Sequence, residues 1–202
     1  MNDQRKYFSA LEILSMQDKN TQQNPNRADE RAHMFFCGMI YWRYNEQLEE
    51  IEFLTINYRE RGIGPLQKKF PGGVSLSGET PIETIIRESK QEVGHKPARK
   101  ALWLIHNHQI EDRVSGRINH IKCFFLSNVV GVTLKTKTGA DQGEASPIEW
   151  TPASQLVRPE DQGGIYKTHR KAFSKSCDNI AQQDKRYAYA LSGILAMIEM
   201  DE

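Results

Sequence analysis

Three side chains with oxygen donors stand at helical spacing within residues 87–94. Glu88, Gln91 and Glu92 occupy positions i, i+3 and i+4, so a helix would present them on one face. Two carboxylates one turn apart repel each other by a few tenths of a kcal/mol, roughly, which makes a cation a natural partner. Oxygen donors that leave several positions to water suit Mg²⁺ or Mn²⁺. Solvated charges on an exposed helix face are the alternative explanation of the same pattern.

The helix that would carry these residues has start and stop signals. Thr80 suits the N-cap and Pro81 the first helical position, and Glu83 completes a capping box three residues after the threonine. Gly94 followed by Pro97 predicts the end of the helix. At about 100° per residue, four apolar side chains fall within one arc that we expect to pack on the core. These four are Ile82, Ile85, Ile86 and Val93.

Residues 73–95 resemble the box of the Nudix hydrolase superfamily. That box reads Gly, five residues, Glu, seven residues, then Arg-Glu-aliphatic-x-Glu-Glu-x-Gly-aliphatic. This sequence matches the motif at the same intervals with Gly73, Glu79, Arg87, Glu88, Glu92 and Gly94. The preceding Phe70-Pro71-Gly72 also matches the segment that usually comes before the box. Ser89 and His95 stand where aliphatic residues are usual, and Gln91 replaces the first glutamate of the pair. The Gln91 amide oxygen can still coordinate a hard cation, but it brings no charge.

The resemblance implies a Mg²⁺ (or Mn²⁺) centre built around this helix. Glu88 and Glu92 would be the principal metal ligands, and Gln91, Gly73 and Glu144 complete the expected metal-binding set. Glu88, Glu92 and Glu144 are the expected catalytic residues. Either Glu88 or a carboxylate of a later loop would orient the attacking water.

The later carboxylate is expected in a polar, glycine-containing loop at residues 133–147. In many family members a segment like Ile148-Glu149-Trp150-Thr151-Pro152 follows a mobile loop that supplies an extra glutamate. Glu144 is the first candidate, ahead of Asp141 and Glu149. An exposed loop charge explains Glu144 equally well.

Four residues of the box are expected to have structural roles. Glu79 and Arg87 would pair and brace the loop against the helix. Gly73 and Gly94 would serve a tight turn and a left-handed cap, because glycine adopts positive φ at little cost.

Substrate-binding residues are expected outside the box, at Tyr58, Arg59, Arg61 and His106. The resemblance places the loop around Arg59 and Arg61 beside the substrate cleft, where a guanidinium can hold a phosphate. Solvated loop charges are the alternative. A second basic stretch, residues 167–171, is open to the same two interpretations.

His106 and His108 share a face of one predicted strand, and His120 lies on the next. Three imidazoles could bind zinc. One alternative is a polar strand face that lines a cleft or faces solvent, and another is contact with a phosphate or ribose of the substrate.

Strands and helices are interspersed along the chain, which indicates the α/β (α+β) class in one domain. Strands are predicted at 33–44, 51–59, 102–110, 118–130 and 148–151, and helices at 3–18, 80–94 and 179–200. The resemblance implies a Nudix-type α/β/α sandwich with a central mixed β-sheet. We expect an N-terminal helix and linker at 1–30, the Nudix domain at 31–178 and a packed C-terminal helix at 179–202.

The composition limits the location and partners of the protein. The 202 residues carry a net charge of +1, and the longest apolar runs are too short to span a bilayer or to serve as a signal peptide. Cys37, Cys123 and Cys177 form no zinc spacing, so reduced thiols in a cytoplasmic protein are expected, with Cys37 and Cys123 as core residues. Balanced charge argues against a nucleic-acid partner and a membrane surface.

Together these features predict a hydrolase that cleaves the pyrophosphate linkage of a nucleoside diphosphate joined to another moiety, such as a nucleotide sugar or dinucleotide, by metal-activated water. The alternative is a nucleotide-binding or sensing Nudix module with weak or no turnover, suggested by Gln91. Hydrolysis of RNA ends is a third class, which the balanced charge weakens. The expected partner is a small-molecule nucleotide, and the resemblance leaves a homodimer open.

Overall fold

The computed structural model describes residues 34–59, 64–111, 118–128, 134 and 148–200. The predicted helix at 3–18 lies outside these residues, as do three site candidates, Arg61, Asp141 and Glu144.

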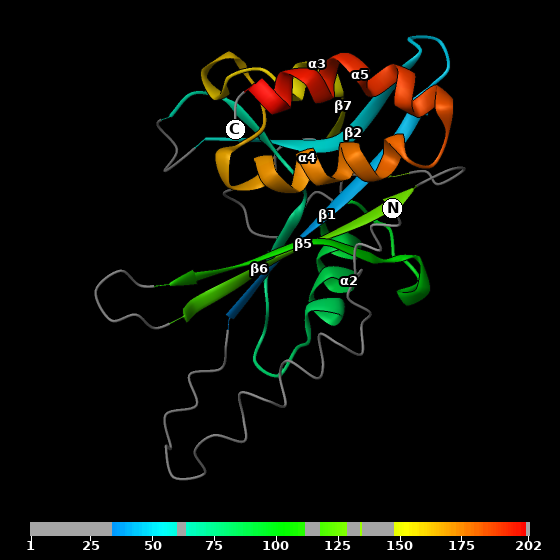
Figure 1. Ribbon diagram of the computed structural model, residues 1–202. Helices are drawn as coiled ribbons and strands as arrows, with labels where there is room; N and C mark the ends of the chain where they lie inside the picture. Colours follow the sequence, from blue (N-terminus) through cyan, green and yellow to red (C-terminus); the bar gives the residue numbers. More distant parts are fainter. Residues whose placement is uncertain (1–33, 60–63, 112–117, 129–133, 135–147, 201–202) are drawn as a thin grey trace, which may run out of the picture.

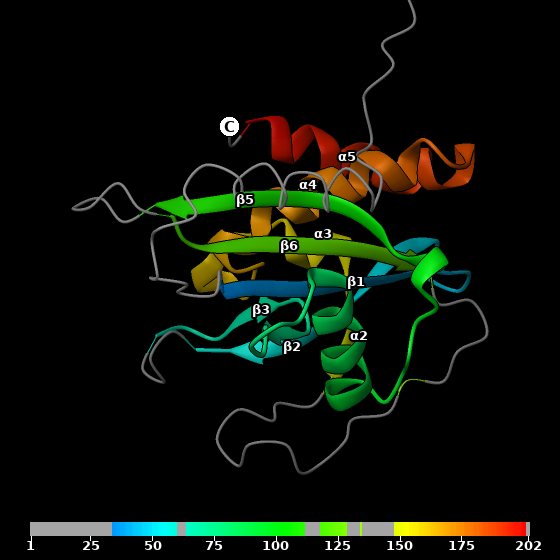
Figure 2. The same cartoon turned by 90° about the horizontal axis from the view of Figure 1, so that it is seen from below.

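A mixed β-sheet forms the centre of the molecule. Its strands are β1 (Met34–Asn45), β2 (Glu50–Tyr58), β3 (Gln67–Lys69), β4 (Gly72–Val74), β5 (Trp103–Glu111), β6 (Ile118–Asn128) and β7 (Ile148–Pro152). The main path runs β3-β2-β1-β6-β5, with β4 paired to β1 and β7 to β2. Figure 2 shows β1, β6 and β5 side by side in this order. β1 and β6 are parallel and the other pairs are antiparallel, which confirms the predicted mixed sheet. All five predicted strands are present.

Helices cover both faces of this sheet. The helices are α2 (Pro81–Glu92), α3 (Ala153–Leu156), α4 (Lys167–Ala181) and α5 (Lys185–Met200), with short turns η2 (Arg99–Ala101) and η3 (Glu160–Gln162). Figure 1 shows α4 and α5 on one face and α2 on the other, which confirms the α/β/α sandwich. Each interface has its own apolar core. Within the described part of the chain, no helix is long and apolar enough to cross a membrane.

The C-terminal region differs from the prediction of one helix at 179–200. α4 continues to Ala181, and a break precedes the start of α5 at Lys185. α4 therefore crosses the predicted domain boundary between residues 178 and 179. Its buried face includes His169, Ser176 and Cys177, and so lacks the strongly apolar stripe by which a helix is recognised in a sequence.

A short segment between β3 and β4 connects the two faces of the sheet. β1 pairs with β4 through residues 36–38 and with β2 only through residues 42–45, so its two neighbours on this side diverge. Between them, Pro71 O accepts a hydrogen bond from Met39 N at 2.7 Å. The Phe70 ring lies in the core on the α4 side, whereas Gly72 contacts α2. β3 and β4, at three residues each, are too short for an alternating pattern to predict them.

The buried face of α2 is rotated relative to the prediction. Ile85 and Val93 are buried as expected, but Ile82 and Ile86 are only half-buried, and Thr84 and Ser89 take their place.

Ser89 is buried because it has polar partners. Its Oγ lies 2.5 Å from the Tyr41 hydroxyl oxygen and donates to the His95 carbonyl at 2.9 Å. The His95 ring lies edge-on to Tyr41, with centroids 5.8 Å apart. Two of the three departures from the Nudix box thus form one contact on the core side of α2. Cys37 and Cys123 lie in this same core, as predicted, and all three cysteines are free.

Candidate active site

The start of α2 is fixed by the predicted capping box. Glu83 N donates to Thr80 Oγ1 at 3.3 Å, and Thr80 N donates to Glu83 Oε2 at 3.0 Å. Pro81 takes the first helical position. At the other end, Gly94 adopts a φ of 71°, in the left-handed region expected for it. Both ends of the helix are therefore set by local sequence.

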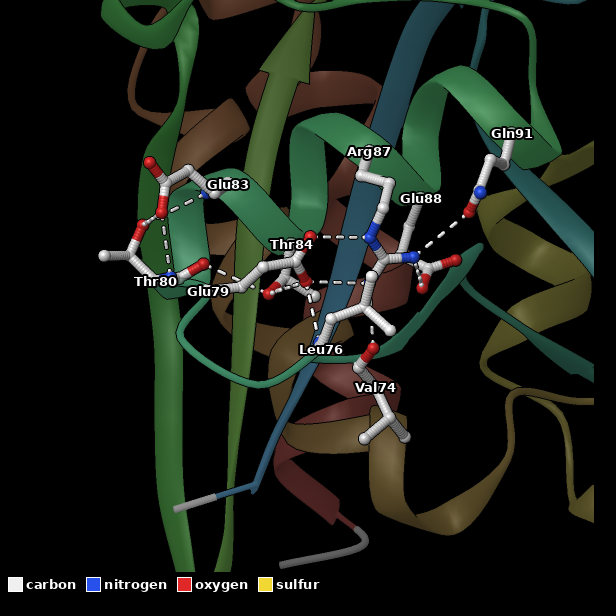
Figure 3. A network of polar contacts seen from close by, with 9 residues as sticks. All are labelled: Val74, Leu76, Glu79, Thr80, Glu83, Thr84, Arg87, Glu88 and Gln91. Carbon is white, nitrogen blue, oxygen red and sulfur yellow. Dashed lines mark hydrogen bonds and ion pairs between the residues drawn. The ribbon is translucent and has the colours of Figure 1, made fainter. Parts of the chain in front are cut away.

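Arg87 is the centre of the polar network in Figure 3. Its Nε and Nη2 donate to the two Glu79 carboxylate oxygens at 2.7 and 2.9 Å, and Nη2 also donates to the Val74 carbonyl at 2.9 Å. The bidentate pair with Arg87, helped by the Leu76 N–H, lowers the pKa of Glu79 to about 2. The structure thus brings together the two residues expected to brace the loop against the helix.

Glu88 and Glu92 both lie against the two glycines that begin β4, Gly72 and Gly73. A Cβ built on Gly73 would lie 2.4 Å from Glu88 Cδ, so no larger residue fits there unless the carboxyl group moves. Glu92 Oε2 accepts a hydrogen bond from Gly72 N at 2.5 Å. Arg87 Nη1 also holds the Glu88 carboxylate by donating to Oε1 at 2.5 Å. Two carboxylates are therefore fixed against the pair of glycines at the start of β4.

Gln91 is exposed, and its Oε1 accepts from the same Arg87 Nη1 at 3.1 Å. The chemistry of this set suits a hard divalent cation, since it offers two carboxylates, one amide oxygen and a backbone turn without a side chain in the way. No three His, Cys, Asp or Glu side chains in the described ranges are grouped so that they could hold a metal ion. The third expected carboxylate, Glu144, lies outside those ranges.

Glu149, the weaker loop candidate, has its ion-pair partner outside the Nudix box. It forms an ion pair with Lys68, whose Nζ also donates to Asn57 Oδ1 at 2.7 Å. Lys68 is buried, so this pair joins β7 to β3 across β2. The pair gives Glu149 a structural contact.

Of the predicted substrate-binding residues, the three that the structure describes do not form one group. The Tyr58 ring packs on Tyr166 with centroids 4.9 Å apart, and Lys69 Nζ lies 4.8 Å from the Tyr58 centroid. Arg59 is exposed, and its Nη1 donates to Gly64 O at 3.4 Å. His106 is buried on the α4 side of the sheet, away from the face that α2 covers.

The histidines on β5 lie beside each other, as their alternation predicted. The rings of His106 and His108 stack with centroids 5.4 Å apart, and His106 also stacks on Phe124 at 6.3 Å. The side chain of His120, the third member of the zinc hypothesis, is outside the described side chains.

His169 is a residue whose place the sequence did not predict. It is buried at the start of α4, and its Nδ1 accepts from Phe70 N at 3.1 Å. Burial is the main cause that holds its pKa well below 6.5, with the charges of Lys122 and Lys69 as further causes. The only sequence signal was its position in the basic stretch 167–171.

Comparisons with known proteins identify the family of this chain. The family model described as the NUDIX domain matches residues 38–172. No curated protein matches the sequence.

Among solved structures, the NUDIX domain of Shewanella oneidensis NrtR, complexed with ADP ribose, superposes with a TM-score of 0.55. The two are 12% identical, over 85% of this chain and 99% of that chain. A NUDIX hydrolase from Nitrosomonas europaea gives a TM-score of 0.54 at 15% identity, over 73% of this chain and 90% of that one.

A MutT/nudix family protein from Enterococcus faecalis is 19% identical with a TM-score of 0.48, over 72% of this chain and 51% of that chain. This chain therefore spans about half the length of that protein. At these identities the structures show the fold alone. Since the family model covers well over half of the sequence, the chain belongs to the Nudix domain family.

Proposed function

We propose that this protein is a divalent-metal-dependent pyrophosphohydrolase. Its substrate is a nucleoside diphosphate linked to another moiety, such as a nucleotide sugar or a dinucleotide. The observation that carries the proposal is the placement of Glu88 and Glu92 against Gly72 and Gly73 at the start of β4, together with the contact of Glu88 with Arg87. ADP ribose, the ligand of the Shewanella domain, belongs to the same substrate class and supports this choice.

The residues that would hold the metal are Glu88, Glu92, Gln91, Gly73 and Glu144. Mg²⁺ or Mn²⁺, when bound, supplies charge neutralisation of the phosphate oxygens and lowers the pKa of water.

The chain's own residues supply positioning. Arg87 fixes the Glu88 carboxylate by one hydrogen bond, so that this carboxylate is oriented before substrate arrives. Either Glu88 or Glu144 orients the attacking water and accepts its proton. Arg59, Arg61, Tyr58 and His106 are the proposed substrate contacts. Tyr58 offers an aromatic face, and the two arginines offer charge for a phosphate.

The test is a hydrolysis assay on a panel of nucleotides, run once with Mg²⁺ and once with Mn²⁺. The panel holds nucleoside di- and triphosphates, dinucleoside polyphosphates, nucleotide sugars and dinucleotide cofactors. Glu92→Gln is compared with wild type and with Glu46→Gln, a control in the exposed turn after β1. We expect turnover of at least one diphosphate-linked nucleotide, a loss of about 10²-fold or more in Glu92→Gln, and no loss in the control. Equal turnover in Glu92→Gln and wild type would remove this carboxylate from the mechanism.

A nucleotide-binding or sensing module with weak turnover is the second candidate. It is favoured by the contact of Gln91 Oε1 with the same Arg87 nitrogen that holds Glu88, because an uncharged group here reduces the negative charge available to a metal. The variant Gln91→Glu distinguishes the two functions. If Mn²⁺ binding and turnover both rise about tenfold with the added charge, the wild-type chain is a weakened enzyme. Nucleotide binding without turnover in either protein would favour the sensing module.

We further propose that the protein is cytoplasmic and that its partner is a small-molecule nucleotide. A measurement of molecular mass in solution decides between a monomer and a homodimer. Three buried thiols that are all free suit a reducing compartment. The assignment of 31–178 to the hydrolase unit and 179–202 to a packed C-terminal helix is part of the same proposal.

A further inference from the structure

The outer side of α5 is an apolar face that no described element covers. α5 packs on α4 and β2 with a buried face that includes Leu191 and Ile194. On its other side Tyr189 is 82% exposed and Met197 is 48% exposed. Between them, a Cβ built on Gly193 would have no neighbour within 4 Å among the described residues beyond the backbone of the helix itself. Figures 1 and 2 both place α5 at the edge of the molecule.

The sequence of α5 is that of a helix covered on all sides. No residue of the range 187–198 is charged, and the Ser192 hydroxyl donates to the Tyr189 carbonyl at 2.9 Å within the helix. A helix at the surface normally has charged residues on its outer side, whereas a helix that is apolar all round is buried. α4 follows the surface pattern, since three exposed lysines line its outer side, at positions 167, 171 and 175. We therefore expect another segment to cover the outer face of α5.

Residues 3–18, which lie outside the described residues, have the pattern that such a cover needs. Tyr7, Leu11 and Leu14 repeat at i, i+4 and i+7, so a helix over this range would have one apolar stripe. A helix over 3–18 has the same length as α5, about 24 Å. An isolated helix this short is marginal in water, so it needs an apolar surface to pack on.

The charges at the helix ends favour an antiparallel arrangement. α5 begins at Lys185, a cation at the positive end of the helix dipole, and residues 199–202 add three acidic side chains near the negative end. Both charges are the reverse of what the dipole favours. In the antiparallel arrangement, Arg5 and Lys6 lie near residues 199–202, and Asp18 lies near Lys185. Each end of α5 then meets charge of the opposite sign.

The small area of this face favours a segment of the same chain over a second copy. One side of a helix of this length presents roughly 240–290 Å², whereas a standard interface buries about 800 Å² on each partner. A tethered segment needs less area, because its effective concentration is in the millimolar range. Residues 19–33 can extend to about 50 Å, which exceeds the width of a domain of this size, about 40 Å. The segment can therefore reach α5 from the start of β1.

We propose that residues 3–18 form a helix that packs antiparallel on the outer face of α5 in the same chain. In this arrangement the centres of the two helices, at Leu11 and Gly193, lie opposite each other, and the glycine leaves room for the leucine side chain. Most of α5 and all of residues 3–18 lie outside the range 38–172 that the family model matches. The two ends of the chain thus form an added layer over α4, independent of the proposed hydrolysis.

The test is the rate at which a maleimide labels a thiol introduced on this face of the full chain. The three native cysteines are buried, so a folded Gly193→Cys protein should take up one label, counted by mass spectrometry. We expect it to react about tenfold more slowly than Lys100→Cys, whose position is exposed, because labelling requires local opening of the covering helix.

Two charge variants of the segment show what covers the thiol. Adding Leu11→Glu/Leu14→Glu to Gly193→Cys should raise the labelling rate about tenfold, since it places charges in the apolar stripe. The control Ser9→Glu/Met16→Glu adds the same charge on the opposite side of the predicted helix and should keep the slow rate. A count of one label in every protein confirms that each variant is folded.

Three results would overturn the proposal. Equal labelling of Gly193→Cys and Lys100→Cys would show that the face is open to solvent. A slow rate that persists with Leu11→Glu/Leu14→Glu would assign the cover to something other than residues 3–18. A rate that falls as the protein concentration rises would assign it to a second copy of the chain.

Discussion

Ser89 and Tyr41 show how this chain departs from the box of its family without losing the helix. A buried hydroxyl costs free energy unless it is hydrogen-bonded, and the two hydroxyl groups satisfy each other. Burial also raises the pKa of Tyr41 to about 12, so its hydroxyl stays protonated at neutral pH. The polar residue at an aliphatic position therefore has a partner on β1.

This pairing predicts strong coupling between the two substitutions. Ser89→Ala and Tyr41→Phe should each cost about 1–3 kcal/mol of unfolding free energy, because each leaves the other hydroxyl with fewer partners. The double variant should cost less than the sum by about 1 kcal/mol. Urea denaturation of the four proteins measures this coupling, with Ser192→Ala on the exposed side of α5 as control. Additive losses would show that the two hydroxyl groups act independently.

Glu79 predicts a pH dependence at the residue scale. Its pKa is about 2 in the folded protein and about 4.5 ordinarily, so folding favours its charged form. The stabilisation is complete above about pH 5 and is lost as pH falls toward 2. Allowing for solvent screening, the loss is about 1 kcal/mol. Denaturation from pH 6 to pH 3 should show a smaller loss of stability in Glu79→Gln than in wild type. Parallel curves would mean that Arg87 does not stabilise the charged form.

At the scale of elements, the ends of α2 decide how the carboxylates are presented. Thr80→Ala removes the acceptor for the Glu83 N–H and should cost about 1 kcal/mol of unfolding free energy. Because the helix start also sets the approach of Glu79 to Arg87, turnover should fall with stability. Chemical denaturation and the hydrolysis assay check both parts, with Thr80→Ser as the variant expected to retain the cap. A Thr80→Ala protein as stable as Thr80→Ser would contradict this role of the hydroxyl.

The elements that were predictable are those with strong local signals. α2 has a capping box and a glycine end, and the hairpin of β1 and β2 has two alternating runs around a polar turn. α4 was missed because its buried face carries His169, Ser176 and Cys177, and these residues depend on tertiary partners. The turn that holds Glu88 and Glu92 was anticipated through its glycines, but β4 itself is fixed by pairing with β1.

The candidate site also has one part that the local sequence predicts and another part that it does not. Spacing alone was enough to bring Glu88, Glu92 and Arg87 together, since all three are on one helix. The grouping of Lys175 with His106, and of His169 with Phe70, joins residues 69 and 99 positions apart. Only the sheet topology creates such pairs, so no local pattern could have predicted them.

At the scale of the molecule, His169 predicts a second and separate pH dependence. It is buried at the meeting point of α4, Phe70 and Phe124, and its pKa is well below 6.5 when folded. Above pH 6.5 both states are neutral, and below it only the unfolded state takes up the proton. Stability should therefore fall as pH drops below 6.5, by up to about 1.4 kcal/mol per pH unit from this residue.

His169→Gln is the variant that checks this slope. Denaturation at pH 7.5, 6.5 and 5.5 should show a shallower loss of unfolding free energy in the variant, whatever its stability at pH 7.5. The experiment also separates His169 from Glu79, which titrates at lower pH. A variant with the wild-type slope would show that His169 is protonated in the folded state.

The parallel pairing of β1 with β6 has a consequence for synthesis of the chain. Met34 is paired with His120, 86 residues later in the chain. β6 is thus the neighbour of β1, the central strand of the sheet. A chain emerging from the ribosome can form the hairpin of β1 and β2 early, but it cannot close the sheet until β6 has left the exit tunnel. Contacts of such long sequence separation slow folding and leave apolar strand edges open to aggregation meanwhile. The order of the strands thus makes β6, and not α2, the segment whose arrival allows the centre of the sheet to form.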